Sequence, residues 1–188
     1  MTPLKVMDLF CGTGGFSKGF ERSGDFEVVY GIDLLPVAVE TFGLNHSSAV
    51  ALAADIRTIR LRQVAEMTGL ARGGVEVIVG GPPCQGFSSL RPFRSSEEDD
   101  PRNSLFEEFA AYVNSFRPPV FVMENVVGLA TYKGGRTIEQ IQECFDQLGY
   151  ASDWRILNAA HFGVPQKRER LVMIGAERGI PLQFPTPT

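Results

Sequence analysis

The chain is poor in the features that mark several classes of protein. Its 188 residues hold three cysteines, Cys11, Cys84 and Cys144, whose odd number and wide spacing fit neither a disulfide framework nor a metal site. No apolar run approaches the roughly 20 residues that span a membrane, and residues 1–5 lack the pattern of a signal peptide. We therefore expect a cytoplasmic protein with free thiols, no bound metal and no membrane contact.

An excess of basic charge is also missing. The chain carries 18 Lys and Arg residues against 22 Asp and Glu residues, which gives a net charge of −4. A chain that binds a nucleic-acid backbone strongly by itself usually has a basic surface. The charge balance argues against strong unaided binding to nucleic acid, although it leaves room for a local basic face.

Short apolar runs alternate with helical patterns along the whole chain. This alternation predicts an α/β fold with a doubly wound, mainly parallel sheet. No linker divides the chain, so we predict one domain over residues 1–180, with the proline-rich residues 181–188 as the start of a connector. The expected strands are 4–10, 26–32, 49–53, 75–79, 120–124, 153–157 and 171–176, and the expected helices are 14–23, 36–45, 61–68, 104–116 and 137–148.

Three strand ends carry residues suited to a nucleotide-like ligand. Residues 8–16 (DLFCGTGGF) join the first strand to the first helix, and their glycines allow a tight turn and a close backbone approach. Asp33 closes the second strand, where a carboxylate can accept hydrogen bonds from ribose hydroxyls. Asp55 closes the third, where it can accept a hydrogen bond from an adenine amino group. Each acid taken singly fits helix capping equally well, but the set favours an adenosine-containing cofactor.

A cysteine follows the strand at 75–79. Residues 80–88 (GGPPCQGFS) place Cys84 after Pro82 and Pro83, which limit the conformations of the turn. A lone cysteine near a strand is usually a small buried hydrophobe, yet that interpretation explains neither the prolines nor the polar stretch that follows. We interpret Cys84 as a nucleophile. The long segment 87–101 fits an active-site lid, because loops of this length in compact domains are often functional.

Two further segments carry polar groups at strand ends. Glu124 ends the apolar strand at 120–124, where a carboxylate can hold or donate a proton, although it also fits a cap of the next segment. In residues 166–170 (QKRER), alternation places Arg168 and Arg170 on the same side. Guanidinium groups suit phosphate and carbonyl oxygens, whereas the run in isolation fits a solvated charged surface.

Together these residues resemble the C5-cytosine DNA methyltransferase family, with several of its motifs in the family's order over nearly the whole chain. Residues 8–16 resemble its cofactor motif, 82–85 (PPCQ) its catalytic motif and 102–106 (RNSLF) the motif after its lid. Residues 124–126 (ENV) and 166–170 resemble its glutamate and arginine motifs. The resemblance implies a Rossmann-like methyltransferase fold and S-adenosylmethionine as methyl donor. By motif position the cofactor would be bound by Phe10, Gly12, Gly14, Asp33, Leu34, Asp55, Ile56, Pro82 and Leu105.

One position departs from the family's pattern. Asp33 replaces the usual glutamate and is one methylene shorter. We expect the ribose contact to survive through a slightly shifted sugar or a bridging water.

The resemblance also implies a covalent mechanism that agrees with the chemistry of the residues. Thiolate attack by Cys84 at C6 makes C5 of cytosine nucleophilic. Glu124 would hold N3 and the exocyclic amine, and Arg170, supported by Arg168, would stabilise charge at O2. The cytosine must leave the stacked duplex to be reached. The sequence does not identify the base that removes the C5 proton.

The resemblance stops before the family's variable target-recognition region and its last conserved segment. We expect the chain to be the catalytic part of a split enzyme whose second polypeptide carries target recognition; a truncated enzyme or a regulatory chain are the alternatives. Competing functions are methylation of RNA, a non-catalytic subunit of the same fold, and a small-molecule methyltransferase. The combined motifs favour DNA cytosine methylation, on double-stranded DNA in a bacterial nucleoid, with the target sequence and biological role left open.

Overall fold

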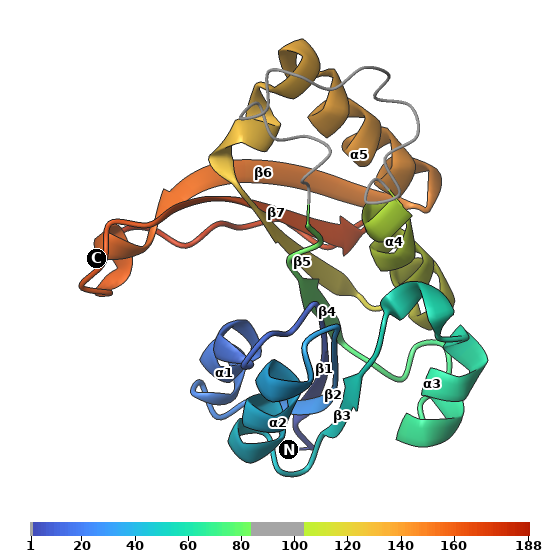
Figure 1. Cartoon of the computed structure of the whole chain (residues 1–188). Helices are drawn as coiled ribbons and strands as arrows, with labels where there is room; N and C mark the ends of the chain where they lie inside the picture. Colours follow the sequence, from blue (N-terminus) through green and yellow to red (C-terminus); the bar gives the residue numbers. More distant parts are fainter. Residues whose placement is uncertain (1, 84–103) are drawn as a thin grey trace, which may run out of the picture.

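The fold is built on a single mixed sheet. The computed structural model describes residues 2–83 and 104–188, and in these the sheet has seven strands in the order β3-β2-β1-β4-β5-β7-β6 (Figure 1). Strands β1 to β5 pair in parallel, while β7 runs antiparallel to both β5 and β6. The strands are β1 (Leu4–Leu9), β2 (Phe26–Asp33), β3 (Val50–Ala53), β4 (Val77–Gly80), β5 (Val120–Asn125), β6 (Tyr150–Asn158) and β7 (Glu169–Glu177).

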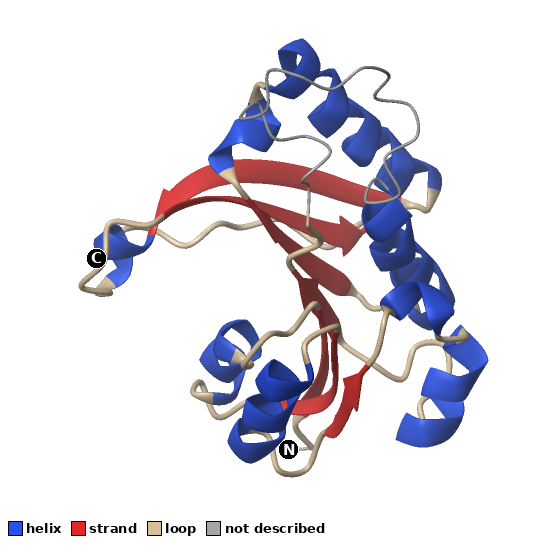
Figure 2. Cartoon of the chain, viewed as in Figure 1, coloured by secondary structure: helices blue, strands red, loops and turns tan. Residues whose placement is uncertain are grey.

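Helices cover both faces of the sheet (Figure 2). Three of them have the bounds that the sequence predicts: α2 (Pro36–Asn45) has Pro36 in its first turn, α3 (Leu61–Thr68) ends at Gly69 in a left-handed conformation, and α4 is Ser104–Phe116. The others are α1 (Gly15–Glu21) and α5 (Arg136–Gln147). Within residues 2–83 and 104–188, four short 3₁₀ helices were not predicted: η1 (Ile56–Thr58), η4 (Val127–Ala130), η5 (Tyr132–Gly135) and η6 (Ala159–Phe162).

Strand alternation divides the core into two layers. Val6 and Val28 pack with Phe42 of α2 on one face, and Met7 and Tyr30 pack on the other with α3, α4 and α5. Figure 1 shows the same division, with α1 and α2 on one side of the sheet and α3 to α5 on the other. The predicted α/β fold with a doubly wound, mainly parallel sheet is confirmed.

The antiparallel strand β7 brings the segment 166–170 close to Glu124 at the end of β5. Because β7 runs against β5, its first residues lie at the carboxyl end of β5, with Glu124 opposite Val172 and Asn125 opposite Leu171. The strand predicted at 153–157 is longer than expected and pairs with β7 from Tyr150 to Asn158. The carboxyl ends of β1, β2, β4 and β5 and the start of β7 therefore share one edge of the sheet.

The segment after β7 returns along β6. The ring of Phe184 is buried, and the guanidinium carbon of Arg155 lies 4.6 Å from its centre. The amide nitrogen of Thr188 donates to the carbonyl oxygen of His161 at 3.0 Å. Residues 181–188, which the sequence assigns to a connector, are thus packed against the domain.

In the parts of the chain that the structure describes, no helix has the length and apolar character needed to cross a membrane.

Candidate active site

The turn after β1 is a tight left-handed structure. Phe10, Gly12 and Gly14 all have positive φ values, of 61°, 51° and 83°. For Gly12 and Gly14 this conformation carries no steric cost, but for Phe10 it is strained, by about 1 kcal/mol or more. The amide of Cys11 donates to the carbonyl of Ile32 at 3.0 Å, which ties the turn to the end of β2.

Asp33 has a structural role in this turn that the sequence did not reveal. Its Oδ2 accepts a hydrogen bond from the amide of Gly12 at 2.9 Å, and its Oδ1 accepts one from the amide of Leu35 at 3.0 Å. Asp33 therefore links the glycine turn to the start of α2. Each carboxylate oxygen has two acceptor positions, so a ribose hydroxyl can still be accepted.

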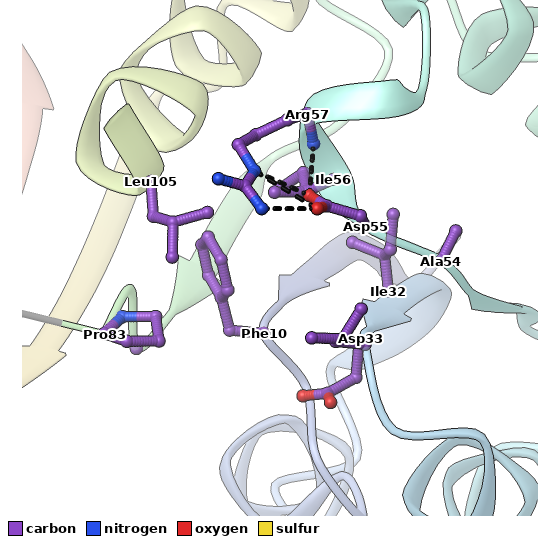
Figure 3. Close-up of a pocket in the computed structure, with 11 residues that line it drawn as sticks. Phe10, Ile32, Asp33, Ala54, Asp55, Ile56, Arg57, Pro83 and Leu105 are labelled. Carbon is purple, nitrogen blue, oxygen red and sulfur yellow. Dashed lines mark hydrogen bonds and ion pairs between the residues drawn. The ribbon is translucent and has the colours of Figure 1, made fainter. Parts of the chain in front are cut away.

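A cavity of about 230 Å³ lies between the glycine turn, η1 and the first turn of α4 (Figure 3). The structure brings together here most of the residues predicted to bind the cofactor, while Gly12, Gly14 and Pro82 are not among the lining residues. The predicted residues in the wall are Phe10, Asp33, Leu34, Asp55, Ile56 and Leu105, and the sequence did not point to Ile32, Ala54, Arg57, Gly81 and Pro83.

Arg57 contacts the carboxylate that the sequence assigns to adenine. Its Nε lies 2.9 Å from Oδ1 of Asp55 and its Nη2 lies 2.5 Å from Oδ2, as Figure 3 shows. Hydrogen bonding from Arg57 lowers the pKa of Asp55 and keeps it ionised. Asp55 also accepts from the amide of Arg57 at 3.0 Å, which caps η1. The sequence signal that could have predicted this ion pair is the separation of only two residues between Asp55 and Arg57.

A second cavity, of about 660 Å³, lies beside the first and shares Phe10 and Gly81 with it. Its polar lining includes Glu124 from β5, Arg170 from the start of β7 and Arg168, which directly precedes that strand. The predictions that these residues lie at a strand end, with both arginines on one side, agree with this geometry. Its remaining lining residues are Asp8, Cys11, Gly15, Phe16, Leu157, Ala159, Phe162, Val164 and Val172.

Glu124 is held by both arginines. Its Oε1 lies 2.7 Å from Nε of Arg170 and 3.7 Å from Nη2 of Arg168, and all three side chains are partly exposed. Nη1 of Arg170 donates to the carbonyl of Glu169 at 2.8 Å, which fixes the plane of the guanidinium. The site therefore offers a carboxylate beside two fixed positive charges, an arrangement that can bind a planar group with both donors and acceptors.

The predicted nucleophile, Cys84, lies outside the described residues, and so does the segment 87–101 predicted to be a lid. The chain can be followed to Pro83. Nδ2 of the buried Asn125, at the end of β5, donates to the carbonyl of Pro82 at 3.0 Å. Residues 82–83 are thus held at the edge of the sheet where both cavities open.

Asp8 is a buried acid that the sequence noted only as the first residue of the turn motif. Its side chain is 1% exposed, and its Oδ2 has no hydrogen-bond partner among the described residues. Burial raises the pKa of Asp8 to about 7, although hydrogen bonding from Ser17 and the charge of His46 oppose the shift. Burial likewise raises the pKa of Cys11, which makes its thiol a poor nucleophile.

Among the described residues no three His, Cys, Asp or Glu side chains come together as a metal site would need. The polar groups of the two cavities are instead carboxylates and guanidiniums at strand ends. Such groups bind an organic ligand through hydrogen bonds and charge.

Comparison with known proteins gives the family. The profile described as C-5 cytosine-specific DNA methylase matches residues 4–187. The chain belongs to this family. Membership implies a methyl-donor cofactor and agrees with the Rossmann-like fold seen here.

Relatives and solved structures agree with this assignment. The chain is 40% identical to the Type II methyltransferase M.AgeI of Thalassovita gelatinovora, over 98% of this chain and 42% of that protein. It is 35% identical to the Type II methyltransferase M.AquIA of Picosynechococcus sp., over 98% of this chain and 76% of that protein. A crystal structure described as a prophage-encoded DNA modification methyltransferase of E. coli matches with a TM-score of 0.80 and 28% identity, over 97% of this chain and 49% of that one.

The chain spans about half the length of the first curated relatives it matches, with 42%, 49% and 44% of their lengths covered. S. pombe Dnmt2 has the same fold, with a TM-score of 0.75 at 24% identity. At this identity the match speaks for the fold alone.

Proposed function

We propose that the chain carries the cofactor-binding and catalytic part of an enzyme that transfers a methyl group from S-adenosylmethionine to C5 of cytosine in double-stranded DNA. The observation that carries the proposal is the adjacency of two cavities of different character. One is lined by Phe10, Asp33 and Asp55, and the other by Glu124 and its two arginines. Because Phe10 and Gly81 border both, a donor in one cavity can meet an acceptor in the other.

The first cavity fits the adenosine part of the cofactor. Phe10, Ile56 and Leu105 provide apolar surfaces for a planar base, and Asp33 provides acceptor positions for ribose hydroxyls. Asp55 would accept from an amino group in place of one of its hydrogen bonds from Arg57. The unpartnered oxygen of Asp8 in the second cavity suits the positive charges at the methionine end. When bound, the cofactor supplies an electrophilic methyl group on a sulfonium sulfur.

The second cavity fits the cytosine. Glu124 would contact N3 and the exocyclic amine, and Arg170 would balance negative charge at O2, with Arg168 holding Glu124 from the other side. A base inside a duplex cannot reach such a cavity, so the cytosine would have to be flipped out.

Cys84 is assigned the covalent step. Its thiolate would form a bond to C6, and the electron pair of the C5–C6 double bond would make C5 the nucleophile that takes the methyl group. Loss of the C5 proton to a base then restores the double bond, and the C6–sulfur bond breaks to release the thiolate. Asn125 supports this assignment, because it holds the carbonyl of Pro82 two residues before the thiol.

We also propose that a second polypeptide takes part in target recognition. The support for this is the net charge of −4, which argues against strong binding of this chain alone to a nucleic-acid backbone.

Mass spectrometry tests the proposal. The chain is incubated with S-adenosylmethionine and duplexes that carry 5-fluorocytosine in many sequence contexts, a base that blocks loss of the C5 substituent and traps the adduct. The expected result is a covalent adduct that is absent in Cys84→Ser but present in Cys144→Ser. Adduct formation only after a polypeptide with the relatives' remaining region is added would support the second-chain proposal. An adduct at full yield from the chain alone would overturn the second-chain proposal. If no adduct forms under either condition, the assignment of Cys84 is overturned.

A further inference from the structure

The end of helix α2 contacts the glycine turn at two consecutive carbonyls. Nδ2 of Asn45 donates to the carbonyl of Thr13 at 2.8 Å. Nε2 of His46 lies 3.2 Å from the carbonyl of Gly14. Neither Asn45 nor His46 lines either of the two cavities described above, and both lie about 30 residues further along the chain than the turn they contact.

His46 is held in one orientation by its surroundings. Its side chain is fully buried, its ring packs 4.6 Å from that of Phe42, and its Nδ1 lies 3.0 Å from Oε2 of Glu21. A carbonyl can only accept a hydrogen bond, so the contact with Gly14 is a hydrogen bond in the tautomer whose Nε2 carries the hydrogen. Oγ of Ser17, from α1, lies 3.2 Å from both Nε2 and the same carbonyl.

Glu21 and Lys18 close the network on the side of α1. Nζ of Lys18 donates to Oε2 of Glu21 at 2.9 Å and to the carbonyl of Asn45 at 3.0 Å. Burial raises the pKa of Glu21, but Lys18 and His46 outweigh this effect and hold the pKa below its usual value. The carboxylate of Glu21 thus lies behind the ring of His46, and Lys18 joins α1 to the end of α2 at the turn.

The turn leaves no room for a side chain at Gly14. A Cβ there would lie 2.5 Å from Nε2 of His46 and 2.9 Å from the ring of Phe42, and the φ of +83° favours glycine in any case. At the other end of α2, Asp33 accepts from the amide of Gly12. The segment from Asp33 to His46 therefore fixes the turn at Gly12, Thr13 and Gly14.

We propose that Asn45 and His46 are positioning residues for cofactor binding, an inference that rests on the proposed function. They act through the backbone of the turn, whose neighbouring residues Phe10, Cys11 and Gly15 form walls of the two cavities. Loss of either hydrogen bond lets the turn rotate its peptide planes, so the cavity walls are no longer preformed when the cofactor arrives.

Three variants of the whole chain test this inference. Asn45→Asp keeps the size of the side chain but replaces the donor to Thr13 with a second acceptor. His46→Gln can still donate to Gly14, whereas His46→Leu cannot. Calorimetric titration with S-adenosylhomocysteine should show the Kd raised about 3- to 10-fold in Asn45→Asp and His46→Leu, with partial recovery in His46→Gln. The matched control is Gln142→Glu on α5, which removes a similar hydrogen bond to the carbonyl of Ser152 on β6, and its Kd should not change.

Hydrogen exchange separates positioning from a general loss of stability. Peptides that cover residues 10–17 should exchange faster in Asn45→Asp, while peptides from β5 and β7 stay unchanged. If wild-type protein binds the ligand and Asn45→Asp binds it equally well with unchanged exchange in the turn, the inference is overturned. If wild-type protein shows no binding, the cofactor assignment of the proposed function fails, and exchange in the turn still decides whether Asn45 and His46 position it. Because Asn45 is exposed, its variant keeps the test open even where His46→Leu does not fold.

Discussion

Replacing Asp8 with asparagine should remove a pH dependence from the stability of this protein. Asp8 lies on β1 with 1% of its surface exposed, and its Oδ2 has no hydrogen-bond partner among the described residues. Burial raises its pKa from 3.8 to about 7; hydrogen bonding from Ser17 and the charge of His46 oppose the shift, and the charge of Asp33 adds to it. Asparagine has the same shape and does not ionise in this range.

The sign follows from the raised pKa. Between about pH 4 and about pH 7 the folded protein keeps a proton that the unfolded chain has released, so the free energy of unfolding falls as pH rises through this window and levels off above it. With the two pKa values of 3.8 and about 7, the loss between about pH 5 and about pH 8 comes to about 2.5 kcal/mol. The Asn variant lacks this loss, so its stability relative to wild type should rise by about that amount over the same range.

Urea unfolding at several pH values measures the effect, since every other titrating group is common to both proteins. The difference in unfolding free energy between Asp8→Asn and wild type is compared across the range. A difference that stays constant from about pH 5 to about pH 8 would refute the argument, because it would mean that Asp8 titrates alike in the folded and unfolded states.

Two further substitutions test the packing and the site. Gly175→Ala on β7 would place a Cβ 2.1 Å from the ring of Phe121 on the paired strand, so urea unfolding should show a loss of about 1–3 kcal/mol in unfolding free energy. In the control Gly43→Ala the nearest neighbour lies 3.7 Å from the added Cβ, so the protein should not be destabilised, and equal stability of both variants would contradict the reasoning. Arg170→Lys removes the Nε that lies 2.7 Å from Oε1 of Glu124. Covalent trapping of 5-fluorocytosine should therefore slow about tenfold or more, while thermal stability stays unchanged. An unchanged trapping rate would exclude a role for this contact.

Local signals in the sequence predicted the elements well. Pro36 and Gly69 mark helix ends by their own backbone chemistry, and the bounds of α2 and α3 follow from them. Alternation within residues 166–170 was enough to predict that Arg168 and Arg170 point to one side. Strand periodicity does not reveal which strands become neighbours, however, and the pairing of β7 with β5 that brings both arginines to Glu124 comes only from the structure.

The parts that the sequence missed are contacts between distant segments. His46 and Asn45 meet the glycine turn across about 30 residues, and no spacing rule connects them. Asp33 was predicted to bind ribose, but the sequence gives no sign of its hydrogen bonds with the amides of Gly12 and Leu35. Arg57, only two residues from Asp55, was within reach of sequence reasoning. The roles of Cys84 and of the predicted lid stay predictions.

The returning segment after β7 has a practical consequence for anyone who labels this protein. Strand β7 leaves the site and ends at the opposite edge of the sheet, yet the packing of Phe184 against Arg155 leads the chain back to His161. His161 precedes Phe162, which lines the second cavity. A fluorophore attached at Thr188 would therefore stand close to Phe162, in the wall of the cavity assigned to the cytosine. It would respond to changes at that wall while the residues that line the cavity stay unaltered.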